Sequence, residues 1–152
     1  MARKLIMGVG NDIRGDDAVG ELVAREFEKP GWETVDCGSV PENHIIMVEE
    51  GEYDLVLIID AASMGLEPGE IRVVPREYLG VFTMSTHALP LSLVMDYLED
   101  KVEKVVLIGI QPEDMSLKEG ITEKVEDAKN RLLEILKKGT WDKIPKLKKK
   151  EN

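Results

Sequence analysis

The segment GVGNDIRGDDAVG, Gly8 to Gly20, combines closely spaced glycines with a pair of acidic residues. The apolar run Leu5–Met7 in front of it is typical of a buried strand. The spacing of Val19, Val23 and Phe27 is typical of one face of a helix. The segment is therefore predicted to be a turn from a strand into a helix. In open α/β sheets such turns lie at the carboxyl edge of the strands, where ligands usually bind.

Two continuous aliphatic runs, Leu55–Ile59 and Val105–Ile110, predict interior strands that are covered on both faces. Shorter strands are expected at 33–36 and 71–74. The link 61–70 contains Gly and Pro and is too short for a helical crossover, so strand 71–74 is predicted to run antiparallel to strand 55–59. Helices are expected at about 17–29, 41–51, 90–98 and 122–138.

This order predicts an α/β fold: a three-layer sandwich with a mostly parallel, twisted sheet of roughly five strands, one of them antiparallel, and helices on both faces. We expect a single domain over residues 1–139, followed by a lysine-rich tail over 140–152. The tail is predicted to be a solvated, partly frayed extension. The alternative is that Trp141 and Ile144 dock on the body or on a partner.

Composition excludes several classes of protein. The net charge of −10 argues against a nucleic-acid partner, because phosphate binding requires a positive field. No stretch has the length or flanks of a membrane span or a signal peptide, so we expect no membrane association. The single cysteine, Cys37, suits a reducing compartment, and we expect a cytoplasmic monomer in which Cys37 is a small, partly buried residue rather than a nucleophile.

Three residues that follow separate elements are predicted to meet at the carboxyl edge: Asp17, Asp60 and His87. Two carboxylates and an imidazole suit a divalent transition metal and leave coordination positions open for substrate. The alternative makes Asp17 a first-turn acid favoured by the helix dipole, Asp60 a loop cap and His87 a surface residue.

The adjacent acids Asp16 and Asp17 point in different directions at a helix start. We expect Asp16 to be the N-cap, with its carboxylate accepting a hydrogen bond from the first turn, and Asp17 to face the cleft. Asp12 and Arg14 are expected to be surface residues.

A dinucleotide site is a second interpretation of Gly8-Val9-Gly10, because Asp36 ends the next strand where a ribose-binding acid would lie. The third glycine of that fingerprint is replaced by Ile13, and the two acids that follow would repel a pyrophosphate. No nucleotide cofactor is therefore expected. No serine elbow of the G-x-S-x-G type is present.

Five motifs occur in an order that resembles one known family: GVGNDIRGDDAVG, DCGSVPEN, LIIDAASMGLEPGEI, STHALPL and LIGIQPE. The chain resembles the nickel-iron hydrogenase maturation endopeptidases, especially the branch that serves the hydrogenase 3 of formate hydrogenlyase. The resemblance covers roughly Lys4 to Lys138. The lysine-rich tail lies outside the shared pattern, and Cys37 stands where a glycine is common.

The resemblance implies an enzyme that removes a C-terminal extension from a hydrogenase large-subunit precursor after nickel insertion. The nickel would be presented by the substrate, and Asp17, Asp60 and His87 match the family's metal-binding positions. Asp17 and Asp60 are the candidates for the catalytic carboxylate. Two rivals share these ligands: a non-catalytic chaperone that binds nickel or the precursor, and an ordinary hydrolase with a resident metal.

Overall fold

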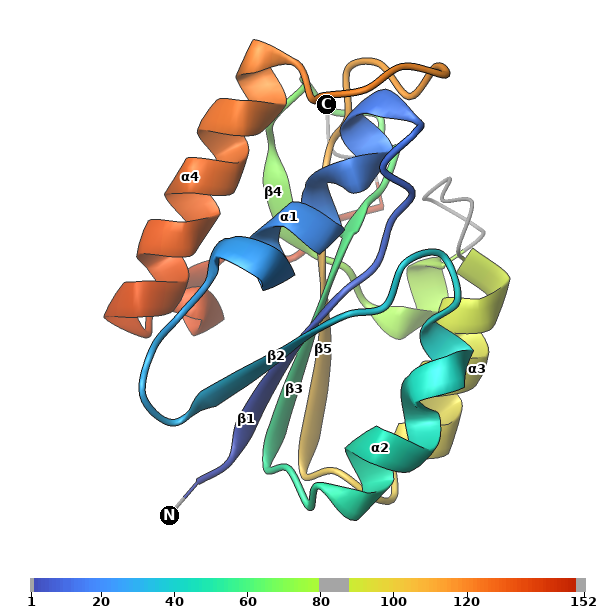
Figure 1. Ribbon diagram of the computed structural model, residues 1–152, viewed down its shortest axis with the longest axis vertical. Helices are drawn as coiled ribbons and strands as arrows, with labels where there is room; N and C mark the ends of the chain where they lie inside the picture. The colour runs from blue at the N-terminus through green and yellow to red at the C-terminus, as the bar shows by residue number, and fades with distance from the viewer. Residues whose placement is uncertain (1, 80–87, 150–152) are drawn as a thin grey trace.

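The computed structural model describes residues 2–79 and 88–149 of the chain. Its five-stranded sheet has the order β2-β1-β3-β5-β4 (Figure 1). The strands are β1 (Lys4–Gly8), β2 (Trp32–Asp36), β3 (Leu55–Ala61), β4 (Ile71–Val73) and β5 (Lys104–Ile110). The α-helices are α1 (Val19–Glu26), α2 (Ile45–Glu50), α3 (Ala88–Leu98) and α4 (Glu123–Lys138). Short 3-10 turns are η1 (Gly15–Ala18), η2 (Pro41–His44), η3 (Arg76–Tyr78) and η4 (Trp141–Lys143).

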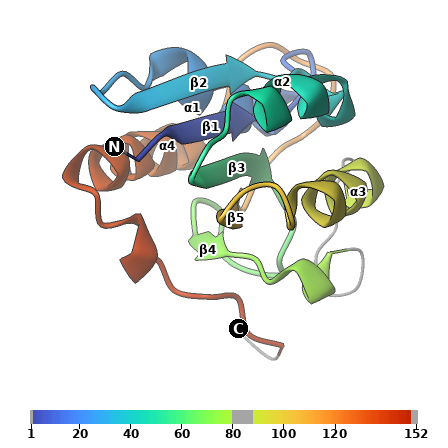
Figure 2. The ribbon, with the colours of Figure 1, turned by 90° about the horizontal axis from the view of Figure 1, so that it is seen from below.

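The sheet lies between two layers of helices. Helices α1 and α4 cover one face, and α2 and α3 cover the other (Figures 1 and 2). All strand pairs are parallel except β4 with β5, which is antiparallel. The predicted three-layer α/β sandwich with one antiparallel strand is therefore confirmed.

The two aliphatic runs form the centre of this sheet. Every residue of β3 is buried, because helices cover both of its faces and β1 and β5 flank it. Within β5, strand β4 pairs with the last three residues, from Ile108 to Ile110. The short link between β3 and β4 leaves no room for a crossover helix, which accounts for the reversed direction.

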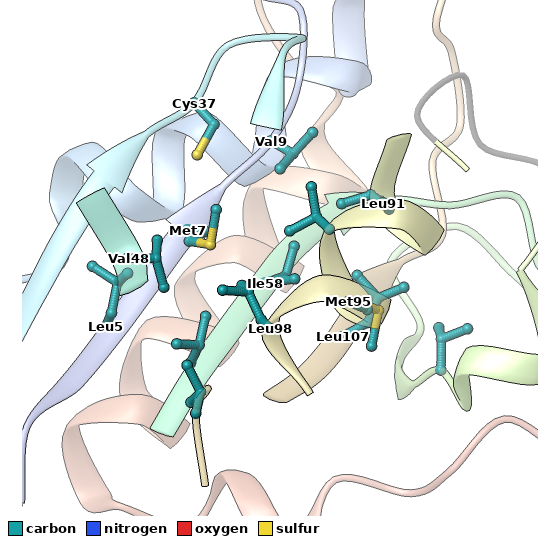
Figure 3. Close-up of a cluster of buried hydrophobic side chains, with 14 of the residues drawn as sticks. Leu5, Met7, Val9, Cys37, Val48, Ile58, Leu91, Met95, Leu98 and Leu107 are labelled. Carbon is teal, nitrogen blue, oxygen red and sulfur yellow. The ribbon is translucent and has the colours of Figure 1, made fainter. Parts of the chain in front are cut away.

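The core on the α2 and α3 side is built from the alternate, same-facing residues of β1 and β3 (Figure 3). Leu5, Met7 and Ile58 contribute from the strands, and Leu91 and Leu98 contribute from α3. Each of these side chains is almost fully buried, which stabilises the fold by about 1.5–3 kcal/mol per side chain relative to exposure.

The glycines of the first turn allow α1 to lie directly on the ends of β1 and β3. A Cβ atom on Gly20 would lie 2.3 Å from the carbonyl oxygens of Ile59 and Val9, and one on Gly10 would lie 2.1 Å from the carbonyl oxygen of Asp17. No side chain fits at either position. This close approach fixes the acidic pair at the carboxyl edge of the sheet, which is the upper edge in Figure 1.

The first helix is shorter than the predicted range 17–29. The chain first forms the 3-10 turn η1, and the α-helical part covers only Val19–Glu26. Neither η1 nor α1 has a side-chain cap at its N-terminus. The acidic pair therefore lies within a tight turn and not in the first turn of a regular helix.

The segment after α4 packs on the sheet. Ile144 and Leu147 are buried, the Val73 amide donates to the Pro145 carbonyl (2.9 Å), and the Leu147 amide donates to the Val73 carbonyl (2.8 Å). The segment thus extends the sheet beyond the outer edge of β4. The expected solvated tail is wrong for these residues, and the alternative of docking on the body holds for Ile144, which is buried, and for Trp141, which is partly buried against the same core cluster. Over residues 2–79 and 88–149, no helix combines the length and apolar character that a membrane span requires.

Candidate active site

Asp17 and Asp60 lie at the carboxyl ends of neighbouring strands. Asp60 is the penultimate residue of β3, and Asp17 belongs to η1, which follows β1. The Val9 amide donates to the Ile59 carbonyl (2.9 Å), so the turn that leads to η1 is tied to β3 beside Asp60. Each of the two residues is only 1% exposed. The sequence prediction that both residues lie at this edge is confirmed, while their chemical roles stay predictions.

The third predicted ligand, His87, lies outside the described residues. Over the ranges 2–79 and 88–149, no group of three or more His, Cys, Asp or Glu side chains is arranged to hold a metal ion. Of the three predicted ligands, the described residues therefore contain the two carboxylates, Asp17 and Asp60, which are hard oxygen ligands suited to a divalent cation.

Asp16 has a different function from the one predicted. Its carboxylate is fully buried and accepts hydrogen bonds from the amides of Glu113 (2.8 Å), Asp114 (2.9 Å) and Thr122 (2.7 Å), and from the Thr122 hydroxyl. Its own amide donates to the Asp114 carbonyl (2.8 Å). The N-cap prediction is wrong, because these donors come from the loop between β5 and α4 and not from α1. We call this arrangement the Asp16 clamp.

Gln111 shapes the same edge from the other side. This residue follows β5 and is buried, and its side-chain oxygen accepts hydrogen bonds from the amides of Met64 (2.6 Å) and Leu66 (3.3 Å). These bonds hold the loop that follows Asp60. The sequence contained one signal for this position, since Gln111 is the only glutamine in the chain.

A second acidic cluster was not predicted. Glu21 is buried in α1, and its carboxylate accepts a hydrogen bond from Arg25 (3.2 Å). Arg25 also donates to Asp36 at the end of β2 (2.6 Å) and lies 3.5 Å from Asp12. The available signal was the spacing of Asp17, Glu21 and Arg25 at successive intervals of four, which places all three on one helical face.

Cys37 is not a nucleophile in this arrangement. Its side chain is buried, and burial raises the pKa of the thiol to about 12, with further contributions from the negative charges of Asp36 and Glu21. A thiol with this pKa carries almost no thiolate at neutral pH. The prediction that Cys37 is a packing residue is confirmed.

Comparison with known proteins identifies the family. A family model described as hydrogenase maturation protease matches residues 18–138. The hydrogenase 3 maturation protease of Escherichia coli (strain K12) is 38% identical over 128 residues, which covers 82% of each chain. The chain belongs to the hydrogenase maturation protease family. It is therefore an enzyme that hydrolyses peptide bonds, and its place in hydrogenase maturation follows from the same match.

Solved structures of this family have the same fold. The solution structure of the endopeptidase HycI from Escherichia coli has a TM-score of 0.88 at 32% identity, and the alignment covers 99% of both chains. The crystal structure of the [NiFe] hydrogenase maturation protease HycI from Thermococcus kodakarensis KOD1 has a TM-score of 0.80 at 36% identity, covering 91% of this chain and 92% of that one.

For a protease of this family, the carboxyl edge has the chemistry that peptide hydrolysis needs. A carboxylate next to the scissile bond can accept a proton from the attacking water. Asp17 and Asp60 are buried carboxylates placed there by neighbouring strands, and unlike Asp16 they do not belong to the Asp16 clamp. By contrast, a cavity of about 630 Å³ lies near the start of β5, between Met95, Val105 and Trp141, and neither Asp17 nor Asp60 lines it. This cavity therefore lies away from the two predicted acids.

Proposed function

We propose that this protease removes the C-terminal extension of a nickel-iron hydrogenase large-subunit precursor after nickel has been inserted. In this proposal nickel belongs to the substrate. Asp17, Asp60 and His87 would complete its coordination, so that binding reports whether insertion is finished. The substrate class is taken from the name of the Escherichia coli relative, which is a hydrogenase 3 maturation protease.

One observation carries the proposal: the burial of two carboxylates, Asp17 and Asp60, at the ends of adjoining strands. Two carboxylates on adjoining strands bring two negative charges into one small region, and carboxylate oxygens are ligands that divalent cations accept. A cation delivered by a substrate would be attracted to such a site. A ligand set of two carboxylates and one imidazole would also leave coordination positions for the groups that the substrate itself supplies.

The chemistry assigned to the chain is proton transfer and positioning. When bound, the substrate's nickel would act as a Lewis acid toward the scissile carbonyl. One of the two carboxylates, Asp17 or Asp60, would accept the proton of the attacking water and later return it to the leaving amine. The buried setting holds both carboxylates in place before substrate arrives, which reduces the reorganisation needed for reaction.

The test compares nickel-loaded and nickel-free precursor, each incubated with the purified protein and analysed by mass spectrometry. We expect loss of the C-terminal extension from the loaded precursor alone. A non-catalytic chaperone would bind the loaded precursor and leave it intact. Cleavage of both precursors at the same rate would show that nickel is not recognised. Metal analysis of protein purified without added metal tests the second rival, because a stoichiometric bound ion would indicate a resident metal.

A further inference from the structure

Glu21 is a buried carboxyl group that the proposed chemistry does not use. It lies in the first turn of α1 and is 4% exposed, although a glutamate with an ordinary pKa would be charged at neutral pH. One of its oxygens, Oε2, accepts the hydrogen bond from Arg25. Within the part of the chain that the structure describes, the other oxygen, Oε1, is buried and has no hydrogen-bond partner. A buried acceptor without a donor is costly, so this atom requires an explanation.

The surroundings of Glu21 are too acidic for every carboxyl group to be ionised. Asp36 lies within hydrogen-bonding reach of Glu21, and the exposed Asp12 lies further out. A single cation, Arg25, contacts all three carboxyl groups. Two carboxylates at hydrogen-bonding distance are both acceptors, so a bond between them forms only when one carries a proton.

The electrostatics assign that proton to Glu21. Burial is the largest cause, and together with the hydrogen bond and charge of Asp36 and the charge of Asp12 it raises the pKa of Glu21 to about 7, against the opposing charge of Arg25. Burial also acts to raise the pKa of Asp36, but hydrogen bonds from the Gly38 amide, Glu21 and Arg25 outweigh it and lower that pKa overall. The two environments therefore separate the groups into a neutral acid and an ionised acceptor.

We propose that Glu21 and Asp36 form a proton-sharing carboxyl pair that positions the Gly8–Asn11 turn beside the catalytic edge. We call it the Glu21–Asp36 pair. Protonated Glu21 donates to Asp36, and the neutral carboxyl group is buried at a lower cost than a second carboxylate beside the same guanidinium group would be. Glu21 is thus a positioning residue, because it acts on the edge through other groups and not through contact with substrate.

Short hydrogen bonds connect this pair to the turn. Asp36 accepts from the Gly38 amide (3.0 Å), and the Gly38 carbonyl accepts from the Gly10 amide (2.9 Å). The next residue, Asn11, donates from its amide to the Asp17 carbonyl (3.2 Å). Glu21 also approaches the turn directly, since a Cβ atom on Gly10 would lie 3.3 Å from Glu21 Oε1.

Loss of the Glu21 proton would break the hydrogen bond between Glu21 and Asp36, which is the first in the series of bonds that leads to the turn. Above neutral pH both members of the pair carry a charge, and they repel each other in a poorly solvated position. The groups that face the pair are Arg25 on the same helix, Asp12 on the preceding loop and the neutral Cys37 thiol after β2. Only Arg25 among them can compensate the added charge, and it is already shared.

Carbon-detected NMR titration of the glutamate carboxyl groups tests the pair without any substrate. We expect the Glu21 carboxyl to titrate near neutral pH, and the amide shifts of Gly10 and Gly38 to change with the same midpoint. In Glu21→Gln, which keeps a donor toward Asp36 at every pH, these two amide shifts should stay constant between pH 6 and 8. Asp36→Asn should return the Glu21 midpoint toward its ordinary value. Asp100→Asn, an exposed acid at the other edge of the sheet, is the matched control and should change none of these values.

A Glu21 midpoint near 4.5, or Gly10 and Gly38 shifts that do not follow it, would overturn the proposal. The wild-type titration decides this even if a variant fails to fold. A second readout rests on the proposed function: precursor processing should slow above pH 7 in the wild type and remain constant to pH 8 in Glu21→Gln. If no precursor is processed, the proposed function fails while the NMR result for the pair still stands.

Discussion

Two acidic regions flank the turn that carries Asp17, and they are built in opposite ways. In the Asp16 clamp, a single carboxylate is surrounded by donors: three backbone amides and a hydroxyl group from the loop between β5 and α4. In the Glu21–Asp36 pair, two carboxyl groups and the nearby Asp12 share one guanidinium group. One region has an excess of donors and the other an excess of acceptors.

This difference teaches that burial alone does not define what an acid does. Asp16 and Glu21 are both almost completely buried near the start of α1. A carboxylate with a full set of donors is stabilised as an anion and joins separate segments of the chain. A carboxyl group that lacks donors tends to keep its proton and becomes sensitive to pH. The candidate catalytic acids Asp17 and Asp60 lie between these two regions.

The largest effect is expected for Asp17 and Asp60 at the carboxyl edge, and it concerns the rate of processing and not the stability of the fold. Asp17→Asn and Asp60→Asn should each reduce the rate of precursor processing by about 10²–10⁴-fold, because an amide cannot accept the proton of the attacking water and binds a cation weakly. Thermal unfolding should change little, since Asn has nearly the same shape. Asp100→Asn should retain the wild-type rate, and normal processing by either edge variant would exclude that residue from the site.

The next effect is expected at the Asp16 clamp and appears in stability. Asp16→Ala should lower the free energy of unfolding by about 3 kcal/mol, because three backbone amides lose their acceptor together. Asp16→Asn keeps one acceptor oxygen and should cost less. Urea unfolding measures both values. A loss near 1 kcal/mol for Asp16→Ala would be the value of a simple N-cap and would contradict the clamp.

The fold of this chain was predictable from its sequence because its central strands, β3 and most of β5, are buried on both faces. Runs such as Leu55–Ile59 and Val105–Ile110 are apolar without interruption, which is typical of strands covered on both faces. The short link after β3 fixed the direction of β4 for a steric reason. The position of the carboxyl edge then followed from the order and direction of the strands, and so did the positions of Asp17 and Asp60.

The different roles of the individual acidic residues were not predictable in the same way. Asp16 and Asp17 are adjacent and chemically identical, and the donors that distinguish Asp16 lie about a hundred residues away in the chain, at Glu113, Asp114 and Thr122. The pairing of Glu21 with Asp36 likewise depends on how α1 crosses the end of β2. Local spacing can place an acid at an edge, but its partners are set by the tertiary structure.

A moderate effect is expected when the Glu21–Asp36 pair is made insensitive to pH. The pKa of Glu21 is raised in the folded state, so the folded protein holds a proton that the unfolded chain releases, and stability should fall as pH rises from about 4.5 to about 7. Glu21→Gln removes this loss. At pH 8 the variant should be more stable than the wild type by about 1–2 kcal/mol, and near pH 4.5 the difference should vanish. Urea unfolding over this pH range provides the comparison, and a wild type with no such slope would contradict it.

The smallest effect is expected at the exposed rim of the same region. The Asp12 side chain is 58% exposed and lies 3.5 Å from Arg25, so Asp12→Asn should change the free energy of unfolding by no more than about 0.5 kcal/mol. Its negative charge nevertheless raises the pKa of Glu21. The Glu21 midpoint, measured by carboxyl NMR, should therefore decrease slightly in Asp12→Asn, and added salt should reduce the difference between the two proteins. A midpoint that increases would mean that Asp12 acts mainly by orienting Arg25, in which case the guanidinium group and not the surplus of acids controls the proton on Glu21.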